Sequence, residues 1–218
     1  MTNLKKLVRL LMSGQVALGW KLVWRWLYSD ATAVGLRREL SAPIKVPAPR
    51  MALTIRPIQP RDIPAFLRTQ GGAQAEAALV RANAMHLLET DLATCFVAET
   101  ERGDVCFMQY LVLPDQNAKL PAVFGGLQPP LEPDEALIEF AFTLEPYRAQ
   151  GVMPWAMGQL AERARDKGAR WLVTYIDEQN RTFLKFYQRL GFRPFRRRLE
   201  KRRFLRRHVA FAPISERA

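Results

Sequence analysis

The fold of this chain is decided by residues 137–192, which read LIEFAFTLEPYRAQGVMPWAMGQLAERARDKGARWLVTYIDEQNRTFLKFYQRLGF. Apolar runs alternate here with helical periodicity, which predicts a strand, a helix, a second strand and a short helix. These elements are expected at Leu137–Leu144, Val152–Lys167, Ala169–Ile176 and Arg181–Leu190. Such an order predicts two neighbouring strands with helices packed against them.

The turn between the first strand and its helix has the features of an anion site. The first N–H groups of a helix have no internal partner, and the helix dipole favours negative charge there. Gly151 lets the backbone approach a phosphate closely, and Arg148 adds a mobile positive charge. The turn therefore predicts a site for a phosphate-bearing ligand, although most turns with a single glycine bind nothing.

This loop resembles the pyrophosphate loop of the GNAT superfamily of acyl-CoA-dependent N-acyltransferases. The family pattern is Arg or Gln, two residues, Gly, any residue, and then Gly or Ala. Here Arg148, Gly151 and Met153 occupy those places. Met153 departs from the usual small residue, which loosens the match.

A second family pattern follows at the expected distance. It consists of Asn, a Tyr seven residues later, and then Gly-Phe. The matching residues are Asn180, Tyr187, Gly191 and Phe192. The element order extends the resemblance over roughly residues 53–200, and it implies an α/β (α+β) fold. That fold has a mixed, mostly antiparallel sheet flanked by helices, with central parallel strands that splay apart.

The resemblance also implies a cofactor site for acetyl-CoA or another acyl-CoA. The pyrophosphate would be held by Arg148, Ala149 and the backbone amides of Gln150, Gly151, Val152 and Met153. The edge of the strand at Phe142, Thr143 and Leu144 would pair with the pantetheine amides. Asn180 would hydrogen-bond the pantetheine arm.

In this family pattern Tyr187 would lie near the departing sulfur and protonate the thiolate. A phenol with a pKa near 10 stays protonated at neutral pH and can donate a proton. The structural alternative is a packed core aromatic, because Phe183, Phe186 and Leu190 surround it on the same predicted helix.

Glu139 is the candidate base that deprotonates the attacking amine. It interrupts an apolar strand, where a carboxylate costs free energy unless it has a task or a partner. Burial would raise its pKa toward the useful range. The alternative is that Glu139 pairs with an arginine from the C-terminal tail. Asp177, Glu178 or an ordered water could replace it as the base.

The chain as a whole predicts one folded domain with an extension. Its 218 residues are 49% hydrophobic, enough to bury a core. The expected organisation is an amphipathic helical extension at 1–40, a Pro-rich linker at 41–52, the GNAT-like domain at 53–213 and a tail at 214–218. Further expected elements are a helix at 3–28, a strand at 53–58, helices at 62–67 and 73–90, a hairpin of 94–100 with 104–113, a long loop at 114–135 and two basic strands within 192–211.

The two cysteines and two histidines limit redox and metal chemistry. In the predicted hairpin Cys95 lies across from about Tyr110 rather than Cys106, which argues against a disulfide and for a reduced, cytoplasmic setting. His86 and His208 offer few ligands, so we expect no metal site. The interrupted apolar run near the N-terminus argues against a signal peptide or a spanning helix.

Both ends of the chain are basic, and the net charge is +12. Trp20, Trp24, Trp26 and Tyr28 beside Lys21 and Arg25 are typical of a membrane-interface helix, at the inner face of the membrane in a cytoplasmic protein. Packing on the protein itself or in a homodimer is the alternative. The arginine-rich tail could bind lipid or nucleic-acid phosphates. We rank nucleic acid below membrane because no known nucleic-acid module accompanies the tail.

The sequence thus predicts an N-acyltransferase, most simply an N-acetyltransferase, acting on an amine of a small molecule or protein. One alternative is a long-chain acyltransferase of the same fold at the membrane. The other is a non-catalytic phosphate- or membrane-binding adaptor on a degenerate form of the fold, motivated by Met153 and the basic tail.

Overall fold

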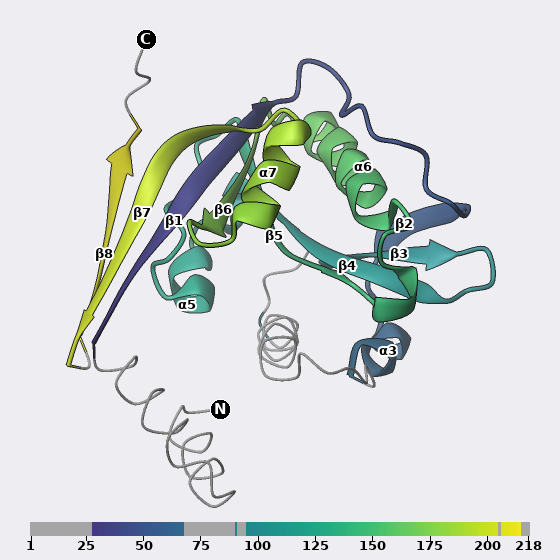
Figure 1. The fold of residues 1–218 in the computed structure, drawn as a ribbon, viewed down its shortest axis with the longest axis horizontal. Coiled ribbons are helices and arrows are strands. Elements are labelled where there is room, and N and C mark those ends of the chain that lie inside the picture. The colour runs from purple at the N-terminus through teal and green to yellow at the C-terminus, as the bar shows by residue number, and fades with distance from the viewer. Residues whose placement is uncertain (1–27, 68–89, 91–94, 205, 215–218) are drawn as a thin grey trace, which may run out of the picture.

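A computed structural model of the chain describes residues 28–67, 90, 95–204 and 206–214. These residues form one eight-stranded sheet in the order β2-β3-β4-β5-β6-β1-β7-β8 (Figure 1). All neighbouring strands run antiparallel except β5 and β6, which are parallel. The predicted mixed, mostly antiparallel sheet with a central parallel pair is therefore confirmed.

The strands and helices keep the order of the sequence. The strands are β1 (Tyr28–Glu39), β2 (Leu53–Pro57), β3 (Cys95–Thr100), β4 (Val105–Val112), β5 (Glu135–Thr143), β6 (Trp171–Asp177), β7 (Arg193–Arg203) and β8 (Arg206–Pro213). The helices are α3 (Ile63–Leu67), α5 (Leu120–Phe124), α6 (Val152–Asp166) and α7 (Arg181–Arg189). Short 3₁₀ turns lie at η1 (Pro60–Asp62), η2 (Pro114–Gln116) and η3 (Glu145–Tyr147).

Most predicted elements are found within one or two residues of their expected ends. The hairpin register is confirmed, because Cys95 lies opposite Tyr110 and both cysteines are free. The segment 114–135 is not one long loop, since it contains η2 and α5. The helices expected at 3–28 and 73–90 lie outside the described residues, apart from positions 28 and 90.

The clearest error in the sequence-based prediction concerns residues 28–40. They were assigned to a helical extension, but Tyr28–Glu39 is a strand inserted between β6 and β7. Ala33, Val34 and Leu36 are all buried, because a central strand is covered on both faces and lacks the usual alternation. Gly35 completes this run because a Cβ there would lie 2.9 Å from atoms of both Tyr175 and Arg196.

The Pro-rich segment 41–52 has no regular structure, but it is packed rather than free. Ile44 is buried among the core residues under α6. A Cβ on Gly158 of α6 would contact Val46, and the Arg50 N–H donates to the Gln150 carbonyl at 3.0 Å. We call residues 41–52 the strap, because they run along α6 to the loop that precedes it (Figure 1).

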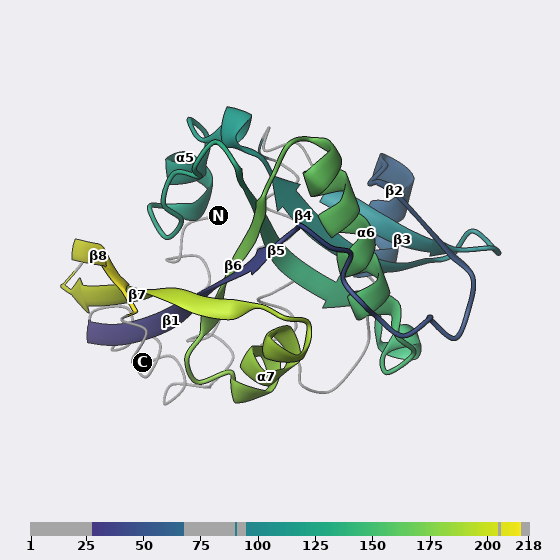
Figure 2. The same cartoon turned by 90° about the horizontal axis from the view of Figure 1, so that it is seen from above.

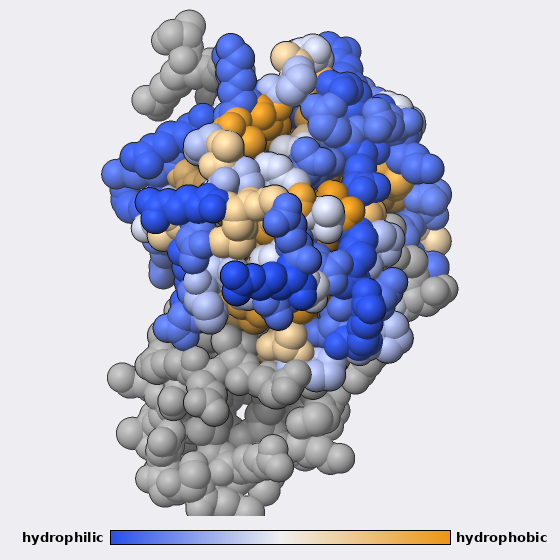
Figure 3. Space-filling view, turned by 90° about the vertical axis from the view of Figure 1, so that its right-hand side faces the viewer, coloured by the Kyte–Doolittle hydropathy of each residue, from blue (hydrophilic) through white to orange (hydrophobic). Residues whose placement is uncertain are grey.

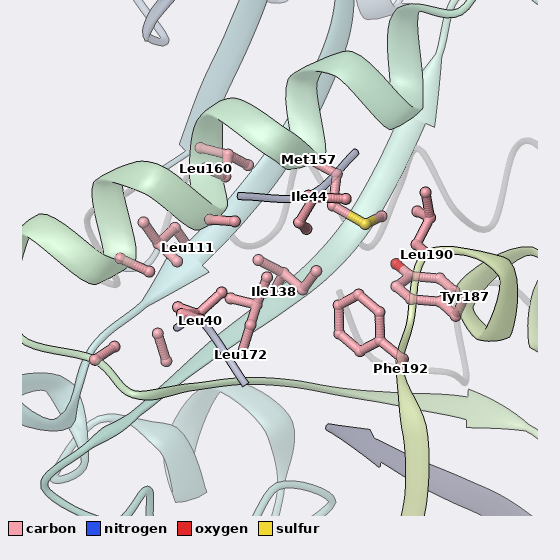
Figure 4. Packing of buried hydrophobic residues seen from close by; sticks show 14 of the residues in the cluster. Leu40, Ile44, Leu111, Ile138, Met157, Leu160, Leu172, Tyr187, Leu190 and Phe192 are labelled. Atoms are coloured by element: carbon pink, nitrogen blue, oxygen red, sulfur yellow. The ribbon is translucent and has the colours of Figure 1, made fainter. Parts of the chain in front are cut away.

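Two hydrophobic clusters occupy the two faces of the sheet. Ile138, Leu172 and Val34 point to the face covered by α6 and α7, whereas their neighbours Leu137 and Val173 point to the face covered by α5. Figure 2 shows α5 and α7 on opposite sides of the sheet. The labelled part of the α6–α7 cluster appears in Figure 4.

From the side of β2 and β3, hydrophobic residues appear as separate patches among hydrophilic ones (Figure 3). None of the described helices has the length and apolar character needed to span a membrane.

Substitution of Leu36 tests whether β1 belongs to the folded domain, because this side chain is buried in the core. Leu36 is 0% exposed, so Leu36→Ala should lower the free energy of unfolding by about 2–5 kcal/mol through lost burial and a residual cavity. Leu199→Ala on β7 is the control, because its side chain is 37% exposed and should cost under about 1 kcal/mol. Urea denaturation measures both, and equal small losses would show that β1 is not part of the core.

Candidate functional site

A cleft of about 770 Å³ opens where β5 and β6 separate. The two strands pair only at Glu135–Trp171, Ala136–Leu172 and Leu137–Val173. Beyond these pairs β6 remains bonded to β1, and β5 to β4, so each strand leaves one backbone edge facing the gap. The splayed parallel strands expected from the sequence are present.

The cleft gathers most of the predicted site residues. Ten of the twelve line it, namely Glu139, Phe142, Thr143, Arg148, Ala149, Gly151, Val152, Met153, Asn180 and Tyr187. Gln150 and Leu144 do not. The backbone of Leu144 is already used, because its N–H donates to the Cys106 carbonyl and its own carbonyl accepts from Tyr147. The chemical roles of the ten residues stay predictions.

The loop before α6 presents free backbone donors to the cleft. Ala149 and Gly151 both have left-handed φ angles, of 59° and 79°, which turn the chain from η3 into the helix. The first intrahelical bond runs from the Trp155 N–H to the Gly151 carbonyl. The N–H groups of Val152 and Met153 precede it and have no helical acceptor, whereas Pro154 has no N–H to leave unpaired. The loop therefore fits an anion.

The strap closes one side of this loop. A Cβ on Gly151 would lie 3.2 Å from Pro49 Cα, closer than ordinary contact. The backbone bond from Arg50 to Gln150 fixes the strap at the same point. Arg50 is exposed and adjoins the loop, so it adds a second cation near Arg148. The sequence analysis missed this role because the strap has no periodic pattern.

A bulge in β5 shapes the wall of the cleft. Met108 lies opposite Phe142 and Tyr110 opposite Glu139, so two residues of β5 face Gln109 alone. One of them, Phe140, has a left-handed φ of 54°. An extra residue of this kind bends a strand and re-aims its side chains, which here helps β5 to diverge from β6.

Glu139 lies at this bulge and is partly buried. Its Oε1 accepts a hydrogen bond of 2.7 Å from Gln128 Nε2. Burial raises the pKa of Glu139 to about 7, against the opposing effects of Arg198, the Tyr175 backbone and Gln128. Arg198, from the C-terminal tail, lowers the pKa of Glu139 through its charge. Its Nη1 donates a hydrogen bond to the Leu127 carbonyl. Glu139 is thus a carboxylate poised to exchange a proton near neutral pH.

The two alternative bases face away from the cleft. Asp177 accepts a hydrogen bond from the Gln179 N–H. Glu178 pairs with Arg197 at 3.2 Å and borders a separate, smaller hollow of about 420 Å³ beside β1. Neither carboxylate lines the cleft at β5 and β6, so the geometry favours Glu139 among the three.

Tyr187 reaches the gap from the opposite face. It is 2% exposed, with its ring edge-on to Phe192 at 5.0 Å (Figure 4). Burial and the nearby Glu139 charge raise the pKa of Tyr187, whereas Thr174 and Gln109 act to lower it. The phenol is therefore protonated at neutral pH. Tyr187 is both a packed core aromatic and a wall of the cleft, so the two interpretations of its sequence pattern are compatible.

Asn180 has a structural task that the sequence analysis did not predict. Its Oδ1 accepts a hydrogen bond of 3.1 Å from the Phe183 N–H and caps α7. The carbonyl oxygen is thus engaged, and the amide nitrogen is the group that remains for a ligand in the cleft.

Two glutamines near the site were also missed. Gln109 is fully buried, and neither of its side-chain amide atoms meets hydrogen-bond geometry, although the amide is close enough to lower the pKa of Tyr187. Gln128 is 5% exposed, and its Oε1 is likewise unpartnered while its Nε2 holds Glu139. Buried polar groups without partners are rare in proteins and often mark functional positions. Gln109 interrupts the apolar run of β4 as Glu139 interrupts that of β5, so the same signal could have found it. Gln128 lies among glycines and prolines and carries no such signal.

The two cysteine thiols and the potential metal ligands among the described residues form no second reactive site. Burial raises the pKa of both thiols, Cys95 and Cys106, to about 12. Within residues 28–67, 90, 95–204 and 206–214, no three His, Cys, Asp or Glu side chains are grouped as a metal site.

Comparison with known structures supports the fold. A GCN5-related glucosamine N-acetyltransferase region of a fungal multi-domain β-N-acetylglucosaminidase is similar with a TM-score of 0.54 and 15% identity, over 85% of this chain and 22% of that one. A tandem GNAT protein from the clavulanic acid biosynthesis pathway gives 0.53 and 17%, over 86% and 55%. A conserved protein of unknown function from Staphylococcus epidermidis gives 0.52 and 13%, over 81% and 63%.

The chain spans less than two thirds of the length of each of these structures. No curated protein sequence matches it. At the level of families, residues 52–193 match the model described as an acetyltransferase (GNAT) domain, which covers more than half of the chain. With the splayed β5–β6 pair in place, the chain belongs to the GNAT acetyltransferase family.

Proposed function

We propose that this protein transfers an acyl group, most simply acetyl, from acyl-CoA to the amine of an acceptor. The observation that carries the proposal is the arrangement of one cleft. The loop before α6 and the unpaired edge of β5 line it, and Glu139 and Tyr187 reach the gap from opposite faces of the sheet.

The residues present fit CoA in charge and in backbone chemistry. Arg148, Arg50 and the free N–H groups of Val152 and Met153 suit a pyrophosphate. The edge of β5 at Phe142 and Thr143 can pair with the amides of an extended pantetheine arm, as a neighbouring strand would. When bound, acyl-CoA supplies the activated acyl group at the gap between β5 and β6.

Glu139 would act on the attacking amine. An alkylamine is protonated at neutral pH and cannot attack until it loses a proton. A carboxylate whose pKa is about 7 can accept that proton while remaining ionised in a useful fraction of molecules. Gln128 holds Oε1, which leaves Oε2 to receive the proton.

Tyr187 would act on the leaving group. Its hydroxyl is protonated because burial raises its pKa, so it can donate a proton to the departing sulfur. The hydroxyl of Thr174 and the amide of Gln109 favour the resulting phenolate, since both lower the pKa of Tyr187. The acyl-chain length and the acceptor would be set by the walls of the cleft, including Phe140, Phe183 and Phe186.

Tyr187→Phe tests the acid. We expect kcat to fall by roughly 10²–10⁴, with the affinity for acyl-CoA kept within a few-fold because the ring still packs on Phe192. Thiol release from acetyl-CoA, with a panel of primary amines that includes glucosamine, measures the rate, and calorimetry measures the affinity. Tyr110→Phe is the control, since Tyr110 is a buried tyrosine that does not line the cleft.

Unchanged turnover in Tyr187→Phe would remove the acid role. Absence of binding to acetyl-CoA and longer acyl-CoAs at millimolar concentration would overturn the whole proposal and favour a non-catalytic adaptor.

The raised pKa of Glu139 predicts a pH profile. Because the ionised form is the base, kcat/KM should fall about tenfold per pH unit below pH 7. Glu139→Gln should lower kcat/KM by roughly 10²–10³ and abolish the inflection near pH 7. Glu101→Gln, in the exposed β3–β4 turn, should retain both. A wild-type rate and profile in Glu139→Gln would assign the base to another group or to water.

The same substitution has a readout that is independent of catalysis. A carboxyl group whose pKa is raised by folding stabilises the native state fully below its unfolded pKa, and this contribution is lost as the pH rises through about 7. Glu139→Gln should therefore be more stable than the wild type at pH 8, as measured by denaturation at pH 8 and pH 5.

Gly151 tests the loop. Gly151→Ala combines a left-handed φ of 79° with a 3.2 Å approach to Pro49, so it should cost about 1–2 kcal/mol of stability and weaken CoA binding. Gly158→Ala is the matched control inside α6, where the nearest atom is 3.7 Å away and alanine should be neutral or stabilising by up to about 1 kcal/mol. Denaturation and calorimetry with CoA measure both variants. Equal CoA affinity in the two would show that the loop does not bind the cofactor.

A further inference from the structure

The start of β1 and the arginine-rich turn between β7 and β8 lie at the same end of the sheet. Tyr28, the first residue of β1, pairs with Arg203 at the end of β7, and Asp30 pairs with Lys201. In Figure 1 this end of β1 and the turn between β7 and β8 project away from the helices that flank the sheet. We call residues 28 and 201–207, without position 205, the hairpin tip.

An aromatic side chain is exposed at the hairpin tip. Phe204 is 67% exposed, the most exposed large hydrophobic residue among those described. Its φ of 48° is left-handed, a conformation that glycine or asparagine adopts at lower cost. The edge of its ring meets Tyr28 at 4.9 Å. The turn itself does not require a large apolar side chain at this position. The exposure of Phe204 therefore indicates that it contacts a partner.

The turn that carries this aromatic pair is rich in positive charge. The tip contains Lys201, Arg202, Arg203, Arg206 and Arg207. Glu200 neutralises Arg202 and Asp30 neutralises Arg203. For the other three cations, no ion pair with a described carboxylate is present, and the guanidinium of Arg207 lies against Gly125 at the end of α5. The net charge of the tip is therefore strongly positive.

The chain that leads into the tip has the same chemistry. Residues 1–27 contain five cations and no acidic residue: Lys5, Lys6, Arg9, Lys21 and Arg25. Three tryptophans, Trp20, Trp24 and Trp26, lie within the last eight of these positions. Because this sequence joins the sheet at Tyr28, it is covalently attached beside Phe204.

We propose that the hairpin tip docks on an anionic lipid bilayer. Phe204 and Tyr28 would enter the headgroup region, where aromatic rings are favoured, and Lys201 and Arg206 would face lipid phosphates. A lipid surface accounts for the exposed aromatic as well as for the charge, whereas nucleic-acid phosphates account for the charge alone. This interaction does not depend on acyl transfer.

Vesicle co-sedimentation of the full-length protein tests the proposal. Wild-type protein should bind phosphatidylcholine vesicles containing about a third phosphatidylglycerol, and bind pure phosphatidylcholine at least roughly tenfold more weakly. Lys201→Glu with Arg206→Glu should weaken binding to the anionic vesicles by a further tenfold or more. Lys185→Glu with Arg189→Glu makes the same charge change on exposed positions of α7, and should change binding less than twofold.

A labelled variant locates the contact. Cys95 and Cys106 are buried, so in Phe204→Cys a polarity-sensitive fluorophore should react at position 204 alone. Its emission should shift to the blue with anionic vesicles, and a label at Glu101→Cys should not shift. Circular dichroism checks that each variant is folded.

Three results would overturn the proposal. The first is wild-type protein that ignores anionic vesicles. The second is vesicle binding without a spectral shift at position 204. The third is a short RNA or DNA duplex that binds more tightly than the vesicles and loses affinity in the Lys201→Glu, Arg206→Glu variant.

Discussion

The short pairing between β5 and β6 is the constraint on which the rest of the structure depends. Three residue pairs join the strands, and beyond Leu137 and Val173 they part. Each strand can lose its partner on one edge because its other edge is hydrogen-bonded. β5 is bonded to β4, and β6 is bonded to β1 over seven residue pairs. The unpaired inner edges would be costly inside a core. Opening them to a cleft turns that cost into a site that can receive a strand-like ligand.

The same gap sets the electrostatics of the site. Glu139 and Tyr187 are brought near each other from opposite faces, and burial disfavours the charged form of each. Their pKa values rise for this shared reason, so the carboxyl group of Glu139 exchanges its proton near pH 7 and the phenol of Tyr187 stays protonated at that pH. Gln128 donates a hydrogen bond to Glu139, and the amide of Gln109 lowers the pKa of Tyr187. Both glutamines thus act on these two groups in a largely apolar setting.

The N-terminal part of the described chain joins elements that are distant in the sequence. β1 lies between β6 and β7 in the sheet, and the strap then follows α6 to the loop that precedes this helix. Gly151 lies where the loop, the strap and the start of α6 converge, which explains why the position needs both a left-handed φ and the absence of a side chain. β1 also brings Tyr28 to the basic turn between β7 and β8, so one strand links the cleft and the hairpin tip.

From the sequence by itself, periodicity and turn chemistry determined the strands β2 to β8 and the helices α3, α6 and α7, because these patterns depend on near neighbours in the chain. The splayed parallel β5–β6 pair and most of the ten residues that line the cleft followed from the resemblance of two short motifs to the GNAT family. The tertiary structure alone decided where Tyr28–Glu39 lies, that residues 41–52 pack, and that Gln128 is buried. A central strand loses its alternation, and an irregular segment has no period. Gln128 lies in such an irregular segment, so its burial depends on residues distant in sequence.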